Sequence, residues 1–159
     1  MRLRYVIGFI TSIGICLAAG AIGAVFTAGS ITTWYAELVK PPFTPPDWIF
    51  APVWTTLYVL MGLSVFLVWL EGFENNEVKA GLGLFAFQLI LNVLWSFVFF
   101  DQGSILGGLI VILALWFILL FTVLNFFRVS ALAGWVLVPY LAWVSFASIL
   151  NLAFLILNG

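Results

Sequence analysis

Five long runs of apolar residues, separated by short polar stretches, dominate the chain. Each run is long enough to cross a hydrocarbon core of about 30 Å at a rise of about 1.5 Å per residue. The pattern therefore predicts an all-α fold, an integral membrane bundle of five transmembrane helices in one domain over residues 1–159. We expect the helices at about 5–26, 48–70, 80–100, 104–127 and 131–157.

The connection between the first two runs, about residues 27–47, is long and rich in proline and aromatic residues. The stretch from Trp34 to Tyr58 holds five of the six prolines and three of the eight tryptophans. Because proline fixes φ and restricts the residue before it, Lys40–Pro46 is predicted to be extended or turned, after a short interfacial helix over Trp34–Val39. Asp47 is the predicted N-cap of the second helix. Loops of this length tend to be functional or disordered, and this composition favours an ordered lid over something buried among the helices.

Short polar turns separate the last three runs. Residues 101–103 and 128–130 leave room only for tight connections, so the third, fourth and fifth helices are predicted to be antiparallel neighbours. Pro139 lies inside the fifth run and predicts a kink there, or backbone carbonyls that lack helical partners near Trp135.

The basic residues sort by side of the predicted bundle. One group comprises Arg2, Arg4, Lys79 and Arg128, and the other side has Lys40 alone. By the positive-inside rule, this asymmetry predicts an N-terminus inside, with the long loop and the C-terminus outside. The first run, about 22 residues long, exceeds the roughly 7–15 residues of a signal-peptide core, so we expect a retained helix. The expected location is a membrane crossed several times by the chain, the cell membrane if the source is prokaryotic.

Composition excludes several kinds of chemistry. The chain is 65% hydrophobic and 7% charged, against about 25% charged in soluble domains, so its solvent is expected to be lipid. It has no histidine and one cysteine, which excludes His-based metal or haem ligation and a Cys-based zinc or iron–sulfur site. Five scattered basic residues and a net charge of −1 argue against nucleic-acid binding. No metal and no tightly bound cofactor are therefore expected.

The predicted spans carry no charge well inside them, which argues against an ion pump, channel or proton-driven transporter. Neutral polar and aromatic side chains remain, and helical spacing places them on one face each of three helices. They are Trp54 and Tyr58 in the second helix, Gln88, Asn92 and either Trp95 or Ser96 in the third, and Tyr140, Trp143, Ala147 and Asn151 in the fifth. Amides are costly in lipid unless paired, so Gln88, Asn92 and Asn151 are predicted to point into the bundle. The three stripes would form a lining that suits a flat, mostly apolar ligand with a few acceptors.

Each of these residues also has a structural interpretation. Deep tryptophans such as Trp54 could belong to interfacial belts, and Gln88 and Asn92 could simply hold helices together. Lys40 could be an interfacial anchor, or a cation at the pocket mouth that meets a ligand carboxylate. Cys16 is expected to be a small packing residue.

Four stretches of the chain together resemble the tryptophan-rich sensory protein / translocator protein family (TspO/MBR, also called peripheral-type benzodiazepine receptor). They are WYAELVKPPFTPPDWIFAPVW with TLY after it, FQLILNVLWSFVFF, the Leu115-Trp116 pair and VPYLAWVSFASILN. The resemblance covers nearly the whole chain, and the first and last stretches in combination make it specific.

The resemblance implies a five-helix bundle, commonly a homodimer, with a pocket under the loop between helices 1 and 2. Protoporphyrin IX, haem and benzodiazepine-site ligands are associated with that pocket. The implied pocket positions are Trp54, Tyr58, Asn92, Trp95, Trp143 and Ala147, with Trp34, Lys40 and Pro42 in the covering loop. Trp54 and Trp143 also resemble two tryptophans implicated in light-dependent porphyrin degradation by some bacterial members.

The chain departs from the family pattern at two places. Leu152 stands where the cholesterol-recognition pattern of eukaryotic members needs a tyrosine, and no basic residue follows it. This argues against cholesterol recognition at the end of the fifth helix. Phe43 stands where many members have tryptophan, which predicts an altered ligand preference.

Three functions remain open from the sequence. The first is a membrane receptor, sensor or transport-like protein that binds porphyrins or other flat hydrophobic molecules. The second is a light- and oxygen-dependent porphyrin-degrading enzyme in which Trp54 and Trp143 supply oxidisable indoles, and the third is a structural membrane protein whose pocket holds lipid or sterol. For a homodimer, the Ala19/Gly23 face of the first helix and residues 81–86 of the third are alternative interfaces.

Overall fold

The computed structural model describes residues 2–159, and every regular element within that range is helical. In chain order the elements are α1 (Arg2–Ile31), α2 (Trp34–Glu37), α3 (Asp47–Leu70), α4 (Asn76–Ser96), the π-helix η1 (Phe97–Asp101), α5 (Ile105–Val129) and α6 (Ala131–Asn158). With η1 continuing α4, five helices are long and apolar enough to cross a membrane. The predicted all-α bundle of five spans is confirmed.

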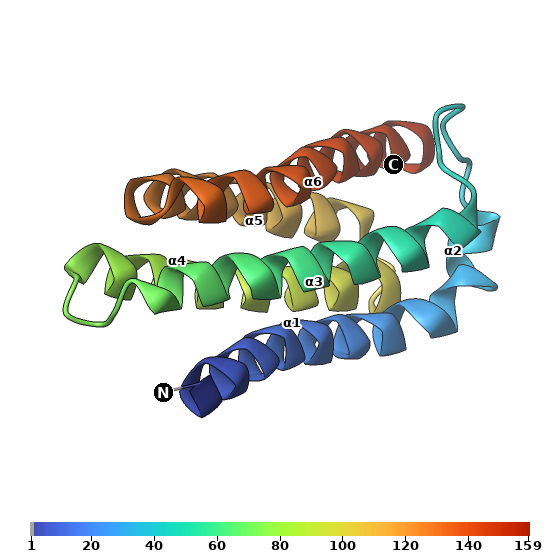
Figure 1. Ribbon diagram of the computed structural model, residues 1–159. Coiled ribbons are helices and arrows are strands. Elements are labelled where there is room, and N and C mark those ends of the chain that lie inside the picture. Colours follow the sequence, from blue (N-terminus) through green and yellow to red (C-terminus); the bar gives the residue numbers. More distant parts are fainter. Residues whose placement is uncertain (1) are drawn as a thin grey trace.

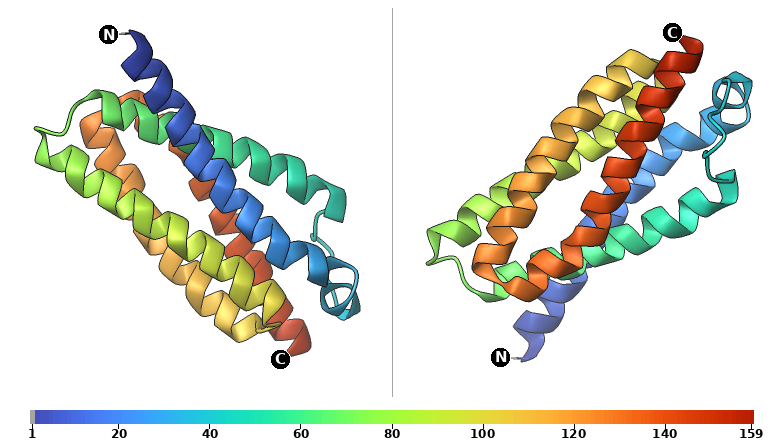
Figure 2. Two further views of the ribbon diagram at one scale, coloured as in Figure 1. Left: turned by 90° about the horizontal axis from the view of Figure 1, so that it is seen from below. Right: turned by 90° about the horizontal axis from the view of Figure 1, so that it is seen from above.

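The long helices lie alongside one another, with the N-terminus at one end of the bundle (Figure 1). The short helix α2, the proline-rich loop and the C-terminus gather at the opposite end (Figures 1 and 2). The helix α5 packs against both α4 and α6, α3 packs against α6 and α1, and α1 packs against α3 and α4. The sequential neighbours predicted from the short turns are therefore present, and α3, α4 and α6 are the helices that enclose the interior under the loop.

The outer faces of the helices carry large apolar side chains. Ile10, Ile90, Ile110 and Ile149 are all exposed. Amide and hydroxyl groups such as Gln88 and Ser64 are instead buried. This arrangement suits a bundle whose surroundings are hydrocarbon, because only the interior offers hydrogen-bond partners.

The first helix is longer than the apolar run alone predicted. It continues to Ile31 rather than ending near residue 26. Two hydroxyl groups in its last turns donate hydrogen bonds to backbone carbonyls. Thr27 Oγ1 donates to the Gly23 carbonyl at 2.9 Å, and Ser30 Oγ donates to the Phe100 carbonyl at 2.6 Å. The connection to α3 is correspondingly shorter than the predicted 27–47. It contains α2, which ends at Glu37 rather than Val39.

Several other helix ends differ from the predictions for local reasons. Pro46 occupies the N-cap position of α3, so the prediction that Asp47 caps this helix was wrong; Asp47 is its first residue. The next span begins at Asn76 rather than residue 80, because the Asn75 side chain accepts a hydrogen bond from the Glu77 amide at 2.9 Å.

The predicted turn at 101–103 is displaced by one residue, to 102–104, and the predicted turn at 128–130 is shorter than expected. Asp101 belongs to η1, and α5 runs on to Val129, so that Ser130 alone separates it from α6. Ser104 caps α5 by accepting from the Gly107 amide. The helix α6 remains helical through Pro139.

Two glycines allow α1 and α3 to approach closely. A Cβ at Gly62 would lie 2.6 Å from the Ile13 Cα, and a Cβ at Gly20 would lie 2.5 Å from the Tyr58 ring. The first contact is with backbone, which cannot rotate away. The position of α1 beside α3 therefore depends on the absence of a side chain at Gly62.

Replacing Gly62 with alanine is expected to destabilise the bundle by about 1–3 kcal/mol, since the added methyl group overpacks the α1–α3 contact. The measurement is denaturant unfolding of the detergent-solubilised protein. Gly14→Ala is the matched control in α1, because a Cβ there meets nothing within 4 Å. Equal stability of the two variants would contradict this view of the contact.

Candidate ligand-binding site

A chain of buried hydrogen bonds joins α3, α4 and α6 across the middle of the bundle. Tyr58 Oη donates to Asn92 Oδ1 at 2.5 Å, and Asn92 Nδ2 donates to Tyr140 Oη at 2.7 Å. Tyr140 Oη in turn donates to Gln88 Oε1 at 2.9 Å. All four side chains are buried, so Gln88 and Asn92 do point into the bundle, where each amide has a protein partner.

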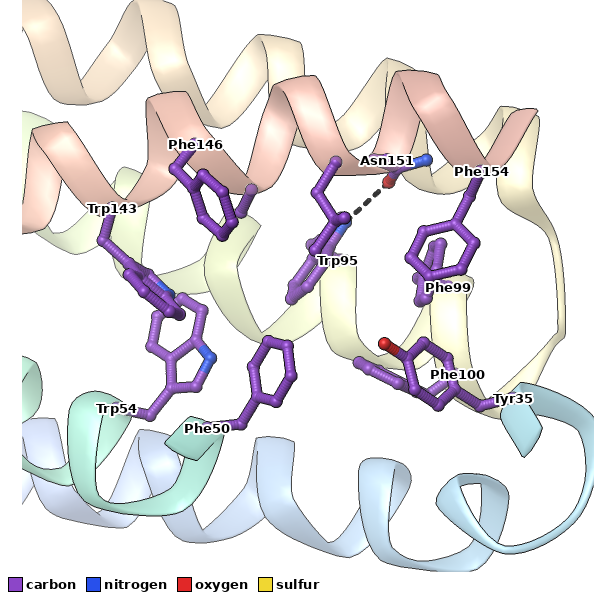
Figure 3. Close-up of a pocket in the computed structure, with 12 residues that line it drawn as sticks. Tyr35, Phe50, Trp54, Trp95, Phe99, Phe100, Trp143, Phe146, Asn151 and Phe154 are labelled. Atoms are coloured by element: carbon purple, nitrogen blue, oxygen red, sulfur yellow. Dashed lines mark hydrogen bonds between the residues drawn. The ribbon is translucent and has the colours of Figure 1, made fainter. Parts of the chain in front are cut away.

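An aromatic cavity lies among α3, α4, η1 and α6, and Figure 3 shows the side chains that line it. We call it the inner cavity. Its lining comprises Tyr35, Phe50, Trp54, Trp95, Phe99, Phe100, Trp143, Phe146, Ala147, Leu150, Asn151 and Phe154. Its free volume is only about 30 Å³, room for no more than a few water molecules. The side chains themselves fill most of the space.

The tryptophans of the inner cavity come from three helices and contact one another. The rings of Trp54 and Trp143 meet edge to face with centroids 6.5 Å apart, as Figure 3 shows. Trp95 lies 6.3 Å from Trp54, and its Nε1 donates to Asn151 Oδ1 at 3.1 Å. Asn151 Nδ2 donates onward to the Ile105 carbonyl. The orientation of Trp95 is therefore fixed by a hydrogen bond to α6.

The indole of Trp143 differs from that of Trp95. Its Nε1 is buried and has no hydrogen-bond partner among residues 3–159. A buried N–H without an acceptor costs about 1–3 kcal/mol. The inner cavity thus contains one donor that an incoming acceptor could satisfy.

A larger space, which we call the side chamber, lies between α1 and α3 and reaches α4. Its volume is about 480 Å³, within the range of about 300–1,000 Å³ for small-molecule sites. Its lining comprises Leu17, Gly20, Ala21, Gly23, Ala24, Thr27, Ala28 and Ile31 of α1, Tyr35 of α2, Asp47, Phe50, Ala51, Trp54, Thr55 and Tyr58 of α3, and Trp95, Ser96 and Phe100. Trp54 and Trp95 also line the inner cavity, so the two spaces share an aromatic wall.

The loop closes the end of both spaces through Tyr35. This side chain is 4% exposed and packs against Phe99, Phe100 and Phe154. Lys40 Nζ lies 4.4 Å from the centroid of the Tyr35 ring and 3.5 Å from Asp47 Oδ1. Burial, and then the nearby Asp47 carboxylate, raise the pKa of Tyr35 to about 12. The phenol is therefore neutral at physiological pH.

The predicted site residues fall into three groups. Trp54, Trp95, Trp143, Ala147 and Asn151 line the inner cavity, and Tyr58 lines the side chamber. The second group comprises Gln88, Asn92 and Tyr140. These side chains line neither space, and their polar groups are hydrogen-bonded to one another.

The third group is in the loop and lines neither space. Trp34 packs on the Phe99 ring, with centroids 5.5 Å apart, and against Gly103. Lys40 lies on the outer face of Tyr35, and Pro42 is exposed. Tyr35, the residue after Trp34, is the residue of this segment that lines the two spaces.

Sequence reasoning missed the phenylalanines and the wall formed by α1. Phe99 lies four residues after Trp95, so helical spacing could have placed it on the same face, where it stacks on Trp95. Phe100 lies five residues after Trp95 in η1, where the helical spacing changes, so a regular period does not place it there. The signal for α1 was present in its small residues, which predicted close helix packing. Gly20 and Gly23 do pack closely, on Tyr58 and Ser96, while Ala24 and Ala28 leave space.

The fold and these spaces define a multi-pass helical membrane protein with an aromatic cavity inside the bundle and without charged groups deep in its described spans. The model of the TspO/MBR family matches residues 12–157. The chain is 50% identical to "Tryptophan-rich protein TspO" of Chlorobaculum tepidum, over 92% of each chain. It is 41% identical to "Translocator protein" of Bos taurus, over 83% of this chain and 79% of the bovine one. It is 36% identical to "Tryptophan-rich sensory protein" of Cereibacter sphaeroides, over 94% and 90%. The chain belongs to the TspO/MBR family, as the resemblance of its motifs predicted.

Replacing Tyr140 with phenylalanine is expected to destabilise the protein by about 1–3 kcal/mol, because the change leaves the Asn92 donor and the Gln88 acceptor buried without their partner. Denaturant unfolding in detergent is the measurement. Tyr5→Phe removes the same hydroxyl at an exposed position of α1 and is expected to have no effect. A Tyr140→Phe variant as stable as Tyr5→Phe would show that the hydrogen-bonded chain contributes nothing measurable.

Proposed function

We propose that this protein is a membrane receptor or sensor that binds porphyrins, such as protoporphyrin IX or haem, and benzodiazepine-type hydrophobic ligands among the aromatic side chains of the bundle. The names of its relatives, a tryptophan-rich sensory protein and a translocator protein, support a sensing or receptor role at a membrane. Transport-like movement of the same ligand would use the same reversible binding. In this proposal the porphyrin is a ligand and not a resident cofactor.

The observation that carries the proposal is the unpartnered Trp143 Nε1 inside an otherwise aromatic cavity. A flat apolar ring with a peripheral carbonyl or carboxylate matches both features, since the ring stacks on indole faces and the oxygen accepts from the N–H. The inner cavity alone is too small for such a ring. Rotation of the Trp54 side chain would join it to the side chamber, because Trp54 lines both spaces.

The charges near the mouth support an amphipathic ligand. Among the described residues, Lys40 is the one cation near the loop end of the two spaces. Its Nζ lies 3.5 Å from Asp47 Oδ1, a long contact, and both side chains are partly exposed. Such a surface pair is worth about 0–1 kcal/mol and can be exchanged easily. A ligand carboxylate would therefore compete with Asp47 for Lys40.

We also propose that the end of the bundle with the N-terminus faces the inner side of the membrane, since Arg4, Lys79 and Arg128 lie toward that end.

Titration with protoporphyrin IX, followed by quenching of tryptophan fluorescence in detergent, is expected to give saturable binding. Trp143→Phe is expected to weaken it roughly two- to tenfold, the value of one hydrogen bond. Trp135→Phe is the matched control, because Trp135 is an exposed residue of the same helix. The proposal fails if binding does not saturate, or if the Trp143 and Trp135 variants bind equally well.

The direct contact between Trp54 and Trp143 favours a second candidate, a light-dependent degradation of bound porphyrin by oxygen. Illumination of the aerated complex is expected to bleach the porphyrin absorption faster than in protein-free micelles. The double variant Trp54→Phe/Trp143→Phe is expected to remove the difference, provided that the porphyrin stays bound. Bleaching at the rate of empty micelles would exclude this activity.

A further inference from the structure

The third membrane span changes its helical spacing at the end near the loop. Up to Ser96 it is the α-helix α4, and from Phe97 to Asp101 it is the π-helix η1. The Gln102 amide donates to the Phe97 carbonyl at 3.0 Å, five residues back instead of four. A turn of this kind holds about one residue more than a turn of α-helix. Residues after Ser96 therefore face directions that a continued α-helix would not give them.

Two consecutive phenylalanines face the same interior because of this change. In an α-helix, residue 100 would lie about 140° around the axis from Trp95. In η1, however, the Phe100 ring contacts Trp95 with centroids 5.8 Å apart. Phe99 stacks on the same indole at 5.6 Å, and both phenylalanine rings contact Tyr35, as Figure 3 shows. The side chains of Trp95, Phe99 and Phe100, which we call the aromatic corner, meet because the turn is π-helical.

The two phenylalanines have different surroundings. Phe99 is buried and packs on α5, where a Cβ at Gly108 would lie 2.8 Å from its ring. Phe100 is partly exposed and lines both the inner cavity and the side chamber. Its ring stands at 79° to the Trp95 indole. A flat ligand parallel to that indole would therefore meet Phe100 edge to face, an arrangement that aromatic pairs prefer. Phe100 is thus an end wall for such a ligand.

A serine of α1 holds the end of η1. Ser30 Oγ donates to the Phe100 carbonyl at 2.6 Å. Carbonyls in the last turn of a helix lack partners in their own helix, and the nearby Ser104 amide donates to Val98 instead. Among the described side chains, those of residues 3–159, Ser30 makes the one hydrogen bond that joins a side chain of α1 to another helix. Ser30 itself lines neither the inner cavity nor the side chamber.

We propose that Ser30 is a positioning residue for the ligand site. Its hydrogen bond keeps η1 in π-helical geometry and so keeps Phe100 in the lining, as the end wall against which a flat aromatic ligand rests. The proposal rests on the proposed function for the identity of the ligand. It adds a residue that acts on the ligand only through the backbone of η1.

The first test uses the protein without ligand. Phe100–Asp101 is the one Phe-Asp pair in the chain, so labelling with ¹³C-carbonyl phenylalanine and ¹⁵N-aspartate gives a single NMR signal for this peptide bond. Ser30→Ala is expected to move the Phe100 carbonyl signal upfield, because the carbonyl loses its donor, whereas Ser30→Thr keeps the hydroxyl and the signal of the parent protein. Thr33→Ala is the matched control, since that hydroxyl donates to the Gly29 carbonyl at an exposed position. An unchanged signal in Ser30→Ala would overturn the proposal.

The second test measures affinity for protoporphyrin IX by tryptophan quenching. Ser30→Ala is expected to weaken binding roughly two- to tenfold, the contribution of one aromatic pair, and Phe100→Leu is expected to weaken it by a similar factor. Because both changes act through the Phe100 ring, the double variant is expected to bind no worse than Phe100→Leu alone. Ser30→Thr and Thr33→Ala are expected to bind like the parent protein.

Two results of this titration would overturn the proposal. One is a double variant in which the two losses multiply, since Ser30 would then act independently of Phe100. The other is a Ser30→Ala variant that binds as tightly as Thr33→Ala. Absence of saturable binding to the parent protein would refute the proposed function instead, and the carbonyl signal, measured without ligand, would still decide whether Ser30 holds η1.

Discussion

The hydrogen bonds from Tyr58 through Asn92 and Tyr140 to Gln88 are the constraint on which the rest of the bundle depends. The hydrocarbon region contains no water to form hydrogen bonds with an amide, so each of these polar groups needs a hydrogen-bond partner on a neighbouring helix. The bonds run from α3 to α4 and on to α6. They fix the three helices that enclose the interior. Because these polar groups form their hydrogen bonds with one another, the space between them and the loop can be lined almost entirely by aromatic side chains.

The position of α1 follows from the same chain of contacts. Tyr58 is held by Asn92 on one side and meets Gly20 of α1 on the other. A larger residue at Gly20 would collide with a ring that cannot move without losing its hydrogen bond. The helix α1 is thereby placed against α3 at its middle, while its alanines leave the side chamber nearer the loop. One tyrosine thus connects the polar interior, the packing of α1 and the floor of the chamber.

Much of the fold could be predicted from the sequence, because a run of about 20 apolar residues without charge has few structural alternatives. The helix ends were less predictable. The cap at Asn75 and the contact of Ser30, near the end of α1, with the Phe100 carbonyl are single hydrogen bonds that hydropathy does not register. The π-helix after Ser96 changes the spacing that a regular helix would give.

The candidate site could be predicted only in part. Helical periodicity placed Gln88, Asn92 and Tyr140 on interior faces, and they do lie inside. Periodicity predicts which face of a helix a residue lies on, but not which residue it forms a hydrogen bond with. It therefore did not predict the hydrogen bonds among these three side chains. In the loop no period applies. The choice of Trp34 and Lys40 over Tyr35 came from residue type and family resemblance, whereas the three-dimensional path of the loop puts Tyr35 into the interior. Whether the lining residues bind a ligand stays a prediction.

An experimental structure of the protein with protoporphyrin IX in a lipid bilayer tests the central claim most directly. We predict that the porphyrin ring lies against Trp54 and Trp95, with the Trp143 indole N–H donating to it and the hydrogen bonds of Asn92 and Tyr140 unchanged. A porphyrin bound outside the bundle, or one that contacts Gln88 and Asn92 after breaking their hydrogen bonds, would contradict the claim.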